Sequence, residues 1–235
     1  MKQAFVLFWE SLKAFWEELF TLVLANLLWF AVAAGPLALA LSLTWVVPPE
    51  VVWVGVVASL VTAPPATAGL NLLANEMAHG RRAPLSLFWR GFQEYFGPAL
   101  GMGLLDLFLL AVIASNYVFY GRFSGRWVPW VQGAWAAVGF LWAATQLYLY
   151  PFLMERTSRS ALLPFRNALF LALAAPLVTG TALLVAAFTL ALSTALAFPL
   201  LAGGVSLIAL YANKVTLAKL VDFKKVQGPG GEGNP

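Results

Sequence analysis

The chain of 235 residues contains no cysteine and a single histidine, His79. The absence of cysteine excludes disulfide bonds, thiol nucleophiles and cysteine-ligated zinc or iron–sulfur centres. With a single histidine we expect neither a histidine metal site nor a His-dependent catalytic triad. The sequence also lacks the phosphate-binding loop, zinc-protease and nucleophile-elbow motifs and any paired carboxylates. We therefore expect no enzymatic chemistry, no catalytic residues, no metal site and no cofactor.

Charged residues are also scarce in this chain. Charged residues make up 10% of the chain and hydrophobic residues 61%, whereas soluble domains have about 25% and about 45–50%. Residues 19–49, 51–75, 127–154 and 167–213 carry no charge, and residues 95–121 contain only Asp106. A net charge of +4 spread this thinly does not favour a nucleic-acid partner. The pattern predicts an integral membrane protein whose main partner is the lipid bilayer.

The apolar intervals predict an all-α fold, a polytopic membrane helix bundle formed by a single domain over residues 1–225. A bilayer core about 30 Å thick needs about 20 apolar helical residues per crossing. The interval 167–213 would form a helix of about 70 Å, so it is divided into two spans. The six predicted transmembrane helices cover about 20–45, 51–75, 97–120, 128–153, 168–192 and 197–218. Residues 226–235 are predicted to be a disordered cytoplasmic tail.

Two segments outside the spans have the pattern of amphipathic interfacial helices. Residues 1–18 place apolar side chains at three- and four-residue spacing among charged ones, and residues 85–96 are rich in aromatics. A third unit starts near Leu162. An offset of 80 lays Phe8 and Trp9 on Phe88 and Trp89, so three repeats of an interfacial helix plus a hairpin are one interpretation. Chance similarity between apolar sequences is the other.

Basic residues predict the topology. With the N-terminus in the cytoplasm, twelve Lys and Arg fall on the cytoplasmic side and only Arg122 and Arg126 on the other. This asymmetry follows the positive-inside rule. We expect a multi-pass membrane protein with both termini in the cytoplasm.

Asp106 is the first candidate for an intramembrane polar site. An ionisable side chain inside the bilayer costs several kcal/mol unless it is paired, hydrated or protonated. Gly103 shares its helical face, which favours close packing and an orientation into the bundle. Asp106 is interpreted either as a proton, cation or subunit-pairing site, the last implying a homo-oligomer, or as a protonated side chain bonded to a helix near Asn26.

Other polar residues and prolines lie inside the predicted spans. Asn26, Asn71 and Asn75 either line a hydrated path with Asp106 or form interhelical hydrogen bonds. Pro64 and Pro65 are a candidate helix break, because proline removes a backbone donor and broken helices build transporter sites. A passive kink is the alternative.

A basic surface is predicted on the cytoplasmic side. These side chains either contact a partner protein or bind lipid headgroups. His79 lies beside them, either as a pH sensor or as a solvated interfacial residue. The candidate contacts are Arg81, Arg82, Arg90, Arg156, Arg159 and Arg166.

Several short motifs resemble the YesL-like family of small bacterial membrane proteins, long labelled as of unknown function. They are Asn26-Leu27-Leu28-Trp29, Pro65-Ala66-Thr67-Ala68, the aromatic segment from Phe88 to Phe96, and Arg166-Asn167-Ala168-Leu169 with Pro176. Members of that family are often encoded beside carbohydrate ABC importer permeases and polysaccharide-degrading enzymes. The resemblance implies a location in the bacterial cytoplasmic (inner) membrane and a role as an accessory subunit of an oligosaccharide ABC importer, with permease subunits as partners. Asp106 does not belong to the family pattern. The alternative from the residues themselves is a stand-alone transporter or channel that uses Asp106 in a proton, cation or substrate path.

Overall fold

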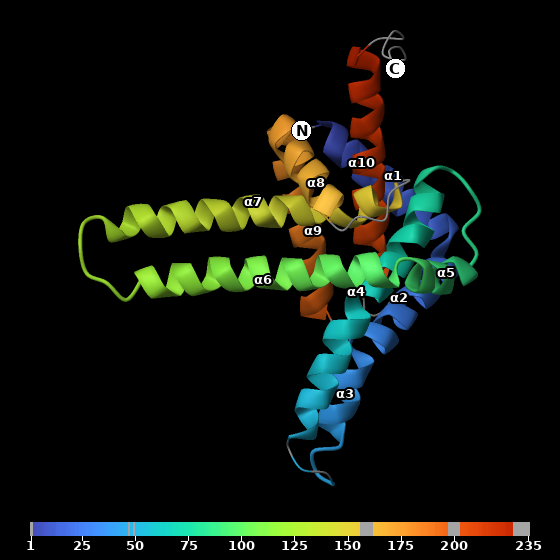
Figure 1. Ribbon diagram of the computed structural model, residues 1–235. Coiled ribbons are helices and arrows are strands. Elements are labelled where there is room, and N and C mark those ends of the chain that lie inside the picture. Colours follow the sequence, from blue (N-terminus) through green and yellow to red (C-terminus); the bar gives the residue numbers. More distant parts are fainter. Residues whose placement is uncertain (1, 47, 49, 156–161, 197–202, 228–235) are drawn as a thin grey trace, which may run out of the picture.

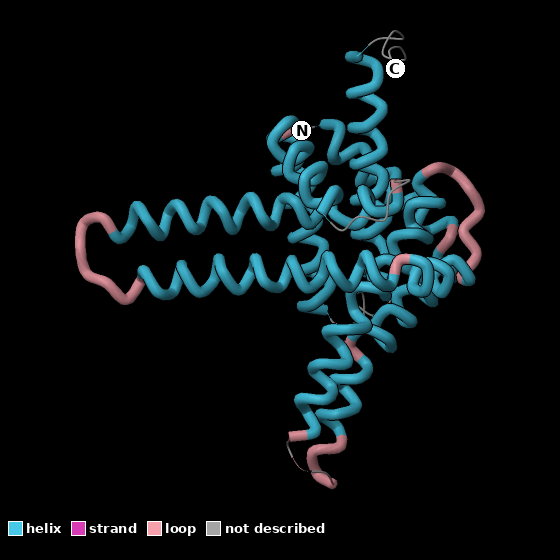
Figure 2. Tube along the Cα trace, viewed as in Figure 1, coloured by secondary structure: helices cyan, strands magenta, loops and turns pink. Residues whose placement is uncertain are grey.

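The computed structural model describes the chain except residues 1, 47, 49, 156–161, 197–202 and 228–235. The described residues form α-helices and no strand, which confirms the all-α prediction for them (Figures 1 and 2). The helices are α1 (Lys2–Glu17), α2 (Leu19–Ala33), α3 (Gly35–Ser42), α4 (Val51–Ala78), α5 (Ser86–Glu94), α6 (Phe96–Tyr120), α7 (Val128–Met154), α8 (Leu162–Ala174), α9 (Pro176–Leu196) and α10 (Val205–Gln227).

Four of these helices, α4, α6, α7 and α9, are long and apolar enough to cross a membrane. A fifth candidate is the pair α1 and α2, which are bent by 95° relative to each other. The protein is therefore a multi-pass membrane protein. The predicted span at 20–45 is divided between α2 and α3. The predicted span at 197–218 overlaps α10, which starts at Val205, and residues 197–202 lie outside the described part.

The break between α2 and α3 has a local cause. Pro36 has no backbone N–H, so the carbonyl oxygen of Val32 loses its helical partner. Thr62 of α4 donates its hydroxyl to that oxygen at 2.6 Å, and the Leu37 N–H donates to Ser59 Oγ at 3.1 Å. Two α4 hydroxyls thus satisfy backbone groups that the break exposes inside the membrane.

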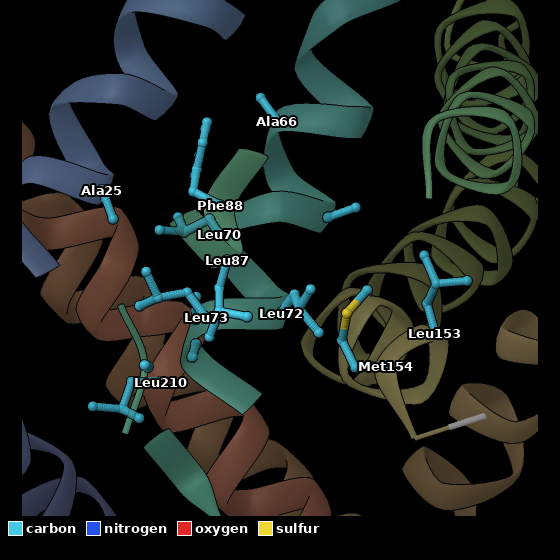
Figure 3. Close-up of a cluster of buried hydrophobic side chains, with 14 of the residues drawn as sticks. Ala25, Ala66, Leu70, Leu72, Leu73, Leu87, Phe88, Leu153, Met154 and Leu210 are labelled. Carbon is cyan, nitrogen blue, oxygen red and sulfur yellow. The ribbon is translucent and has the colours of Figure 1, made fainter. Parts of the chain in front are cut away.

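Helix α4 lies at the centre of the bundle and contacts α2, α3, α5, α6, α7 and α10. Its second half is almost entirely buried. Figure 3 shows Phe88 of α5 among side chains of α4, α2 and α10. Helices α4 and α5 cross at Gly69 and Gly91, where a Cβ on Gly91 would lie 2.8 Å from the Gly69 Cα. Glycine at both positions permits this approach, which fixes α5 against the core.

Two hairpin arms extend from the core in different directions (Figure 1). One consists of α3 with the first half of α4, and the other of α6 with α7. Their outer parts expose large apolar side chains, including Trp53, Phe108, Trp130 and Phe140. Such surfaces are stable against lipid but not against water.

Candidate functional site

Asp106 is held at the base of the α6–α7 arm. Its Oδ1 accepts hydrogen bonds from Trp142 Nε1 at 2.8 Å and from Gln146 Nε2 at 2.7 Å. Both donors lie on α7 four residues apart, so one helix face presents them together. The alternative partner from the sequence, the region of Asn26, is not the one observed. Asp106 does point to a neighbouring helix, but that helix is α7.

A cavity of about 260 Å³ lies between α4, α6 and α7, and Asp106 is in its lining. Gly103 allows α6 to approach α4 closely there, because a Cβ at Gly103 would collide with the ring of Pro64. A second cavity of about 280 Å³ is lined by Asn71 and Gln146. Thr67 and Tyr150 line both cavities.

Thr67 connects three helices at the boundary between these cavities. Its Oγ1 accepts the indole N–H of Trp29 at 2.9 Å and donates to the Ala63 carbonyl oxygen at 2.8 Å. Tyr150 is hydrogen-bonded to the same hydroxyl. The Thr67 hydroxyl therefore joins α2, α4 and α7.

The carboxyl of Asp106 forms no ion pair among the described residues. The described part also holds no cluster of three or more His, Asp or Glu side chains that could bind a metal ion. Two neutral donors stabilise one carboxyl oxygen, and the cavity lies beside it. The site can therefore accept hydrogen bonds from a donor-rich solute or take up a proton or a single cation.

Asn71 and Asn75 belong to a different arrangement, a chain of amides that includes Asn213 of α10. Asn75 Nδ2 donates to Asn213 Oδ1 at 3.2 Å, and Asn213 Nδ2 donates to Asn71 Oδ1 at 3.0 Å. Asn71 Nδ2 then donates to the Thr67 carbonyl oxygen at 2.9 Å. All three asparagines are buried. This amide chain satisfies buried polar groups and joins α4 to α10.

Asn26 forms a different contact with α10, at the start of that helix. Its Oδ1 accepts the backbone N–H of Ser206 at 3.1 Å, and both residues are fully buried. Ser206 lies in the first turn of α10, where backbone N–H groups have no helical partner. Asn26 is therefore placed away from Asp106, at the start of α10.

Helix α4 continues through Pro64 and Pro65 without interruption. The helical interruption of this region lies at Gly35 and Pro36 instead, between α2 and α3. The role of Pro64 in the structure is to pack its ring against α6 at Gly103.

The candidate basic surface is partly described. Arg81 forms an ion pair with Glu76, and Arg90 lies 4.0 Å from Glu94. Arg82, Arg90 and Arg166 are exposed. The remaining two candidates, Arg156 and Arg159, lie outside the described residues.

Some residues of the site were not singled out from the sequence. They are Thr67, Trp142, Tyr150, Glu155 and Asn213. A usable signal was present, because Thr67, Asn71, Asn75 and His79 recur at a spacing of four and so form one stripe on α4. Trp142, Gln146 and Tyr150 repeat the same spacing on α7.

Taken together, the fold and the site define an all-helical, multi-pass membrane protein with a polar site inside the bundle. No family model, curated protein or solved structure matches the chain. The resemblance to the YesL-like family therefore stays a prediction from sequence motifs.

Proposed function

We propose that this protein is a non-enzymatic accessory subunit of a carbohydrate ABC importer in the bacterial cytoplasmic membrane, where it contacts the permease subunits. The class of partner and of solute comes from the YesL-like resemblance. The structural observation that supports a subunit role is the α6–α7 arm, which packs on the core at its base and exposes apolar side chains farther out (Figure 1). Such an arm offers transmembrane helices to a partner.

The proposal includes six crossings, formed by α2 with α3, α4, α6, α7, α9 and α10. Support comes from the order of the elements. A short helix precedes a longer helical hairpin three times, with α1, α5 and α8 as the short helices. This order agrees with three repeated units. An even number of crossings agrees with twelve basic residues on the side of the termini and two on the other.

Affinity purification from the native membrane tests the subunit role. Permease proteins of a carbohydrate importer are expected in the eluate when partners are identified by mass spectrometry. Replacing Phe108 and Phe140 on the arm by Ala should reduce their recovery at least severalfold. The matched control is Phe188→Ala on α9, which removes a similarly exposed ring, 69% against 63% and 62%, outside the arm. A purified protein without permeases, or equal recovery by all variants, contradicts the proposal.

A stand-alone transporter or channel is the second candidate, and Asp106 favours it. Two donors orient its carboxyl beside a cavity of about 260 Å³, and a second cavity follows beyond Thr67 and Tyr150. A proton, cation or small polar solute passing between the cavities would meet these groups. The purified protein in liposomes, as a monomer or homo-oligomer, should then carry solute or proton flux. Asp106→Asn should abolish that flux, and the exposed control Glu94→Gln should not. Liposomes without flux contradict this second candidate.

A further inference from the structure

His79 and Glu155 meet at the end of the buried amide chain, where α4 and α7 both end. His79 Nδ1 lies 2.9 Å from the carbonyl oxygen of Asn75, and His79 Nε2 lies 3.4 Å from Glu155 Oε1. The same Oε1 accepts the Asn75 Nδ2 at 2.7 Å. Both nitrogens of the only histidine in the chain therefore face oxygen atoms.

This arrangement needs one proton more than a neutral imidazole and an ionised carboxylate provide. A carbonyl oxygen can only accept, so the proton of a neutral imidazole is on Nδ1. The Nε2 lone pair would then face the carboxylate of Glu155, which also only accepts. A proton on Nε2 turns this repulsion into a charge-assisted hydrogen bond from the imidazolium to the Glu155 carboxylate. We propose that His79 and Glu155 form a binding site for one exchangeable proton that links the end of α4 to the end of α7.

The surroundings make the site accessible from one side. The side chains of His79 and Glu155 are 24% and 22% exposed, so water can reach them. Behind them, Asn75 and Asn213 are buried. The proton can therefore exchange with solvent while its binding partners remain attached to the core.

The other charged groups that the structure describes near this end of the bundle are engaged elsewhere or directed to solvent. On the segment of His79 itself, Glu76 pairs with Arg81, and Arg82 is exposed. From α10, Lys214 donates to the Glu10 carbonyl oxygen of α1 at 2.9 Å, in a hollow that Ala78 also lines. Among the described residues, Glu155 of α7 is the acidic group within ion-pair distance of His79. The carboxylate of Glu155 is therefore the group that can accept the Nε2 proton of the imidazole.

The proton strengthens a contact between α4 and α7 that Asn75 already makes by donating to Glu155. Asn75 donates to both Glu155 and Asn213, and Asn213 donates onward to Asn71. With the proton bound, Glu155 accepts from two α4 side chains. After the proton leaves, Asn75 is the remaining donor to Glu155 among the residues that the structure describes. Proton binding thus tightens the junction of α4, α7 and α10, independently of the role proposed above.

The single histidine allows a direct test by nuclear magnetic resonance. The full chain, labelled with ¹⁵N in histidine and placed in lipid nanodiscs, gives one pair of ring nitrogen signals over a pH series. We expect the ring nitrogen signals to change over a different pH range in Glu155→Gln than in the wild type, because the variant lacks the carboxylate that accepts the Nε2 proton. The glutamine amide can donate to a bare Nε2, so this variant removes the need for the proton while retaining the contact. Glu94→Gln, which alters an acid on α5, is the control and should match the wild type.

Two results would overturn the proposal. One is equal proton affinity of His79 in the wild type and in Glu155→Gln. The other needs no variant. At high pH the neutral ring must carry its proton on Nδ1, and a proton found on Nε2 would contradict the geometry even if Glu155→Gln fails to fold.

Discussion

The hydroxyl of Thr62 on α4 bonds to the carbonyl oxygen of Val32 on α2 at 2.6 Å. This carbonyl lacks a partner because Pro36 provides no N–H four residues later. The Thr62 hydroxyl of α4 therefore replaces the backbone hydrogen bond that is missing where α2 ends. It also explains why two short helices are stable where lipid offers no hydrogen bonds.

Replacing Thr62 by Val tests whether the interrupted span depends on this hydrogen bond. Valine retains the shape of threonine, but the Val32 carbonyl oxygen then has no donor, and we expect the free energy of unfolding to fall by about 1–3 kcal/mol. Denaturant unfolding in detergent micelles measures the change. Thr181→Val is the matched control, because its hydroxyl bonds only to Leu177 of its own helix. Equal losses of unfolding free energy in the two variants would contradict a stabilising hydrogen bond from Thr62 to Val32.

The contact between Gly103 and Pro64 gives a second prediction. A Cβ at Gly103 would overlap the proline ring, which cannot rotate away, so Gly103→Ala should destabilise the protein by about 1–3 kcal/mol. Gly97→Ala on the same helix is the control, because nothing lies within 4 Å of the added Cβ. There alanine should be neutral or stabilising by up to about 1 kcal/mol. Thermal unfolding of both variants in one detergent decides between them, and a tolerated Gly103→Ala would refute the close crossing of α6 and α4.

Asp106 gives a third prediction through its two donors. Asp106→Asn retains an oxygen that accepts from Trp142 and Gln146, so its unfolding free energy should stay near that of the wild type. Asp106→Leu leaves both donors unpaired and should lower it by about 1–3 kcal/mol. Trp142→Phe removes one of the donors, so combining it with Asp106→Leu should cost less than the sum of the two. Strict additivity would show that the indole N–H and the carboxyl do not interact in the membrane.

The sequence predicted the helical class and four of the apolar helices, because these follow from hydropathy and helical spacing. The partner of Asp106 could not be predicted, since spacing within α6 does not say which neighbouring helix faces it. Asn213 was missed for a related reason. It lies beside Lys214 at the edge of an uncharged interval, and its role depends on α10 meeting α4, a contact between residues 142 positions apart.

The effect of the prolines could not be predicted from the sequence either. Both Gly35-Pro36 and Pro64-Pro65 remove backbone donors, yet only the first pair separates two helices. The outcome depends on what surrounds each pair. Thr62 and Ser59 supply hydrogen bonds where α2 and α3 part, whereas Pro64 is packed against α6 at Gly103. These neighbours belong to distant segments, so a local reading of proline does not distinguish a break from a packed proline.

The topology is the last prediction, and it rests on charge and on the arrangement of the ends. The end of α10 and the start of α1 lie on one side of the molecule, the tip of the α3–α4 arm lies on the opposite side, and the α6–α7 arm extends sideways (Figure 1). The outside location of the α6–α7 tip follows from charge alone. Reporter fusions after Pro48 and Arg126 should therefore report an extracytoplasmic location, and fusions after Arg82, Thr157 and Lys225 a cytoplasmic one. The fusion at Arg126 is decisive, because it carries one of the two basic residues assigned to the outside. A cytoplasmic signal there would place the tip of the α6–α7 arm on the same side as the termini. That result would rule out α6 and α7 as crossings and with them the six-span arrangement.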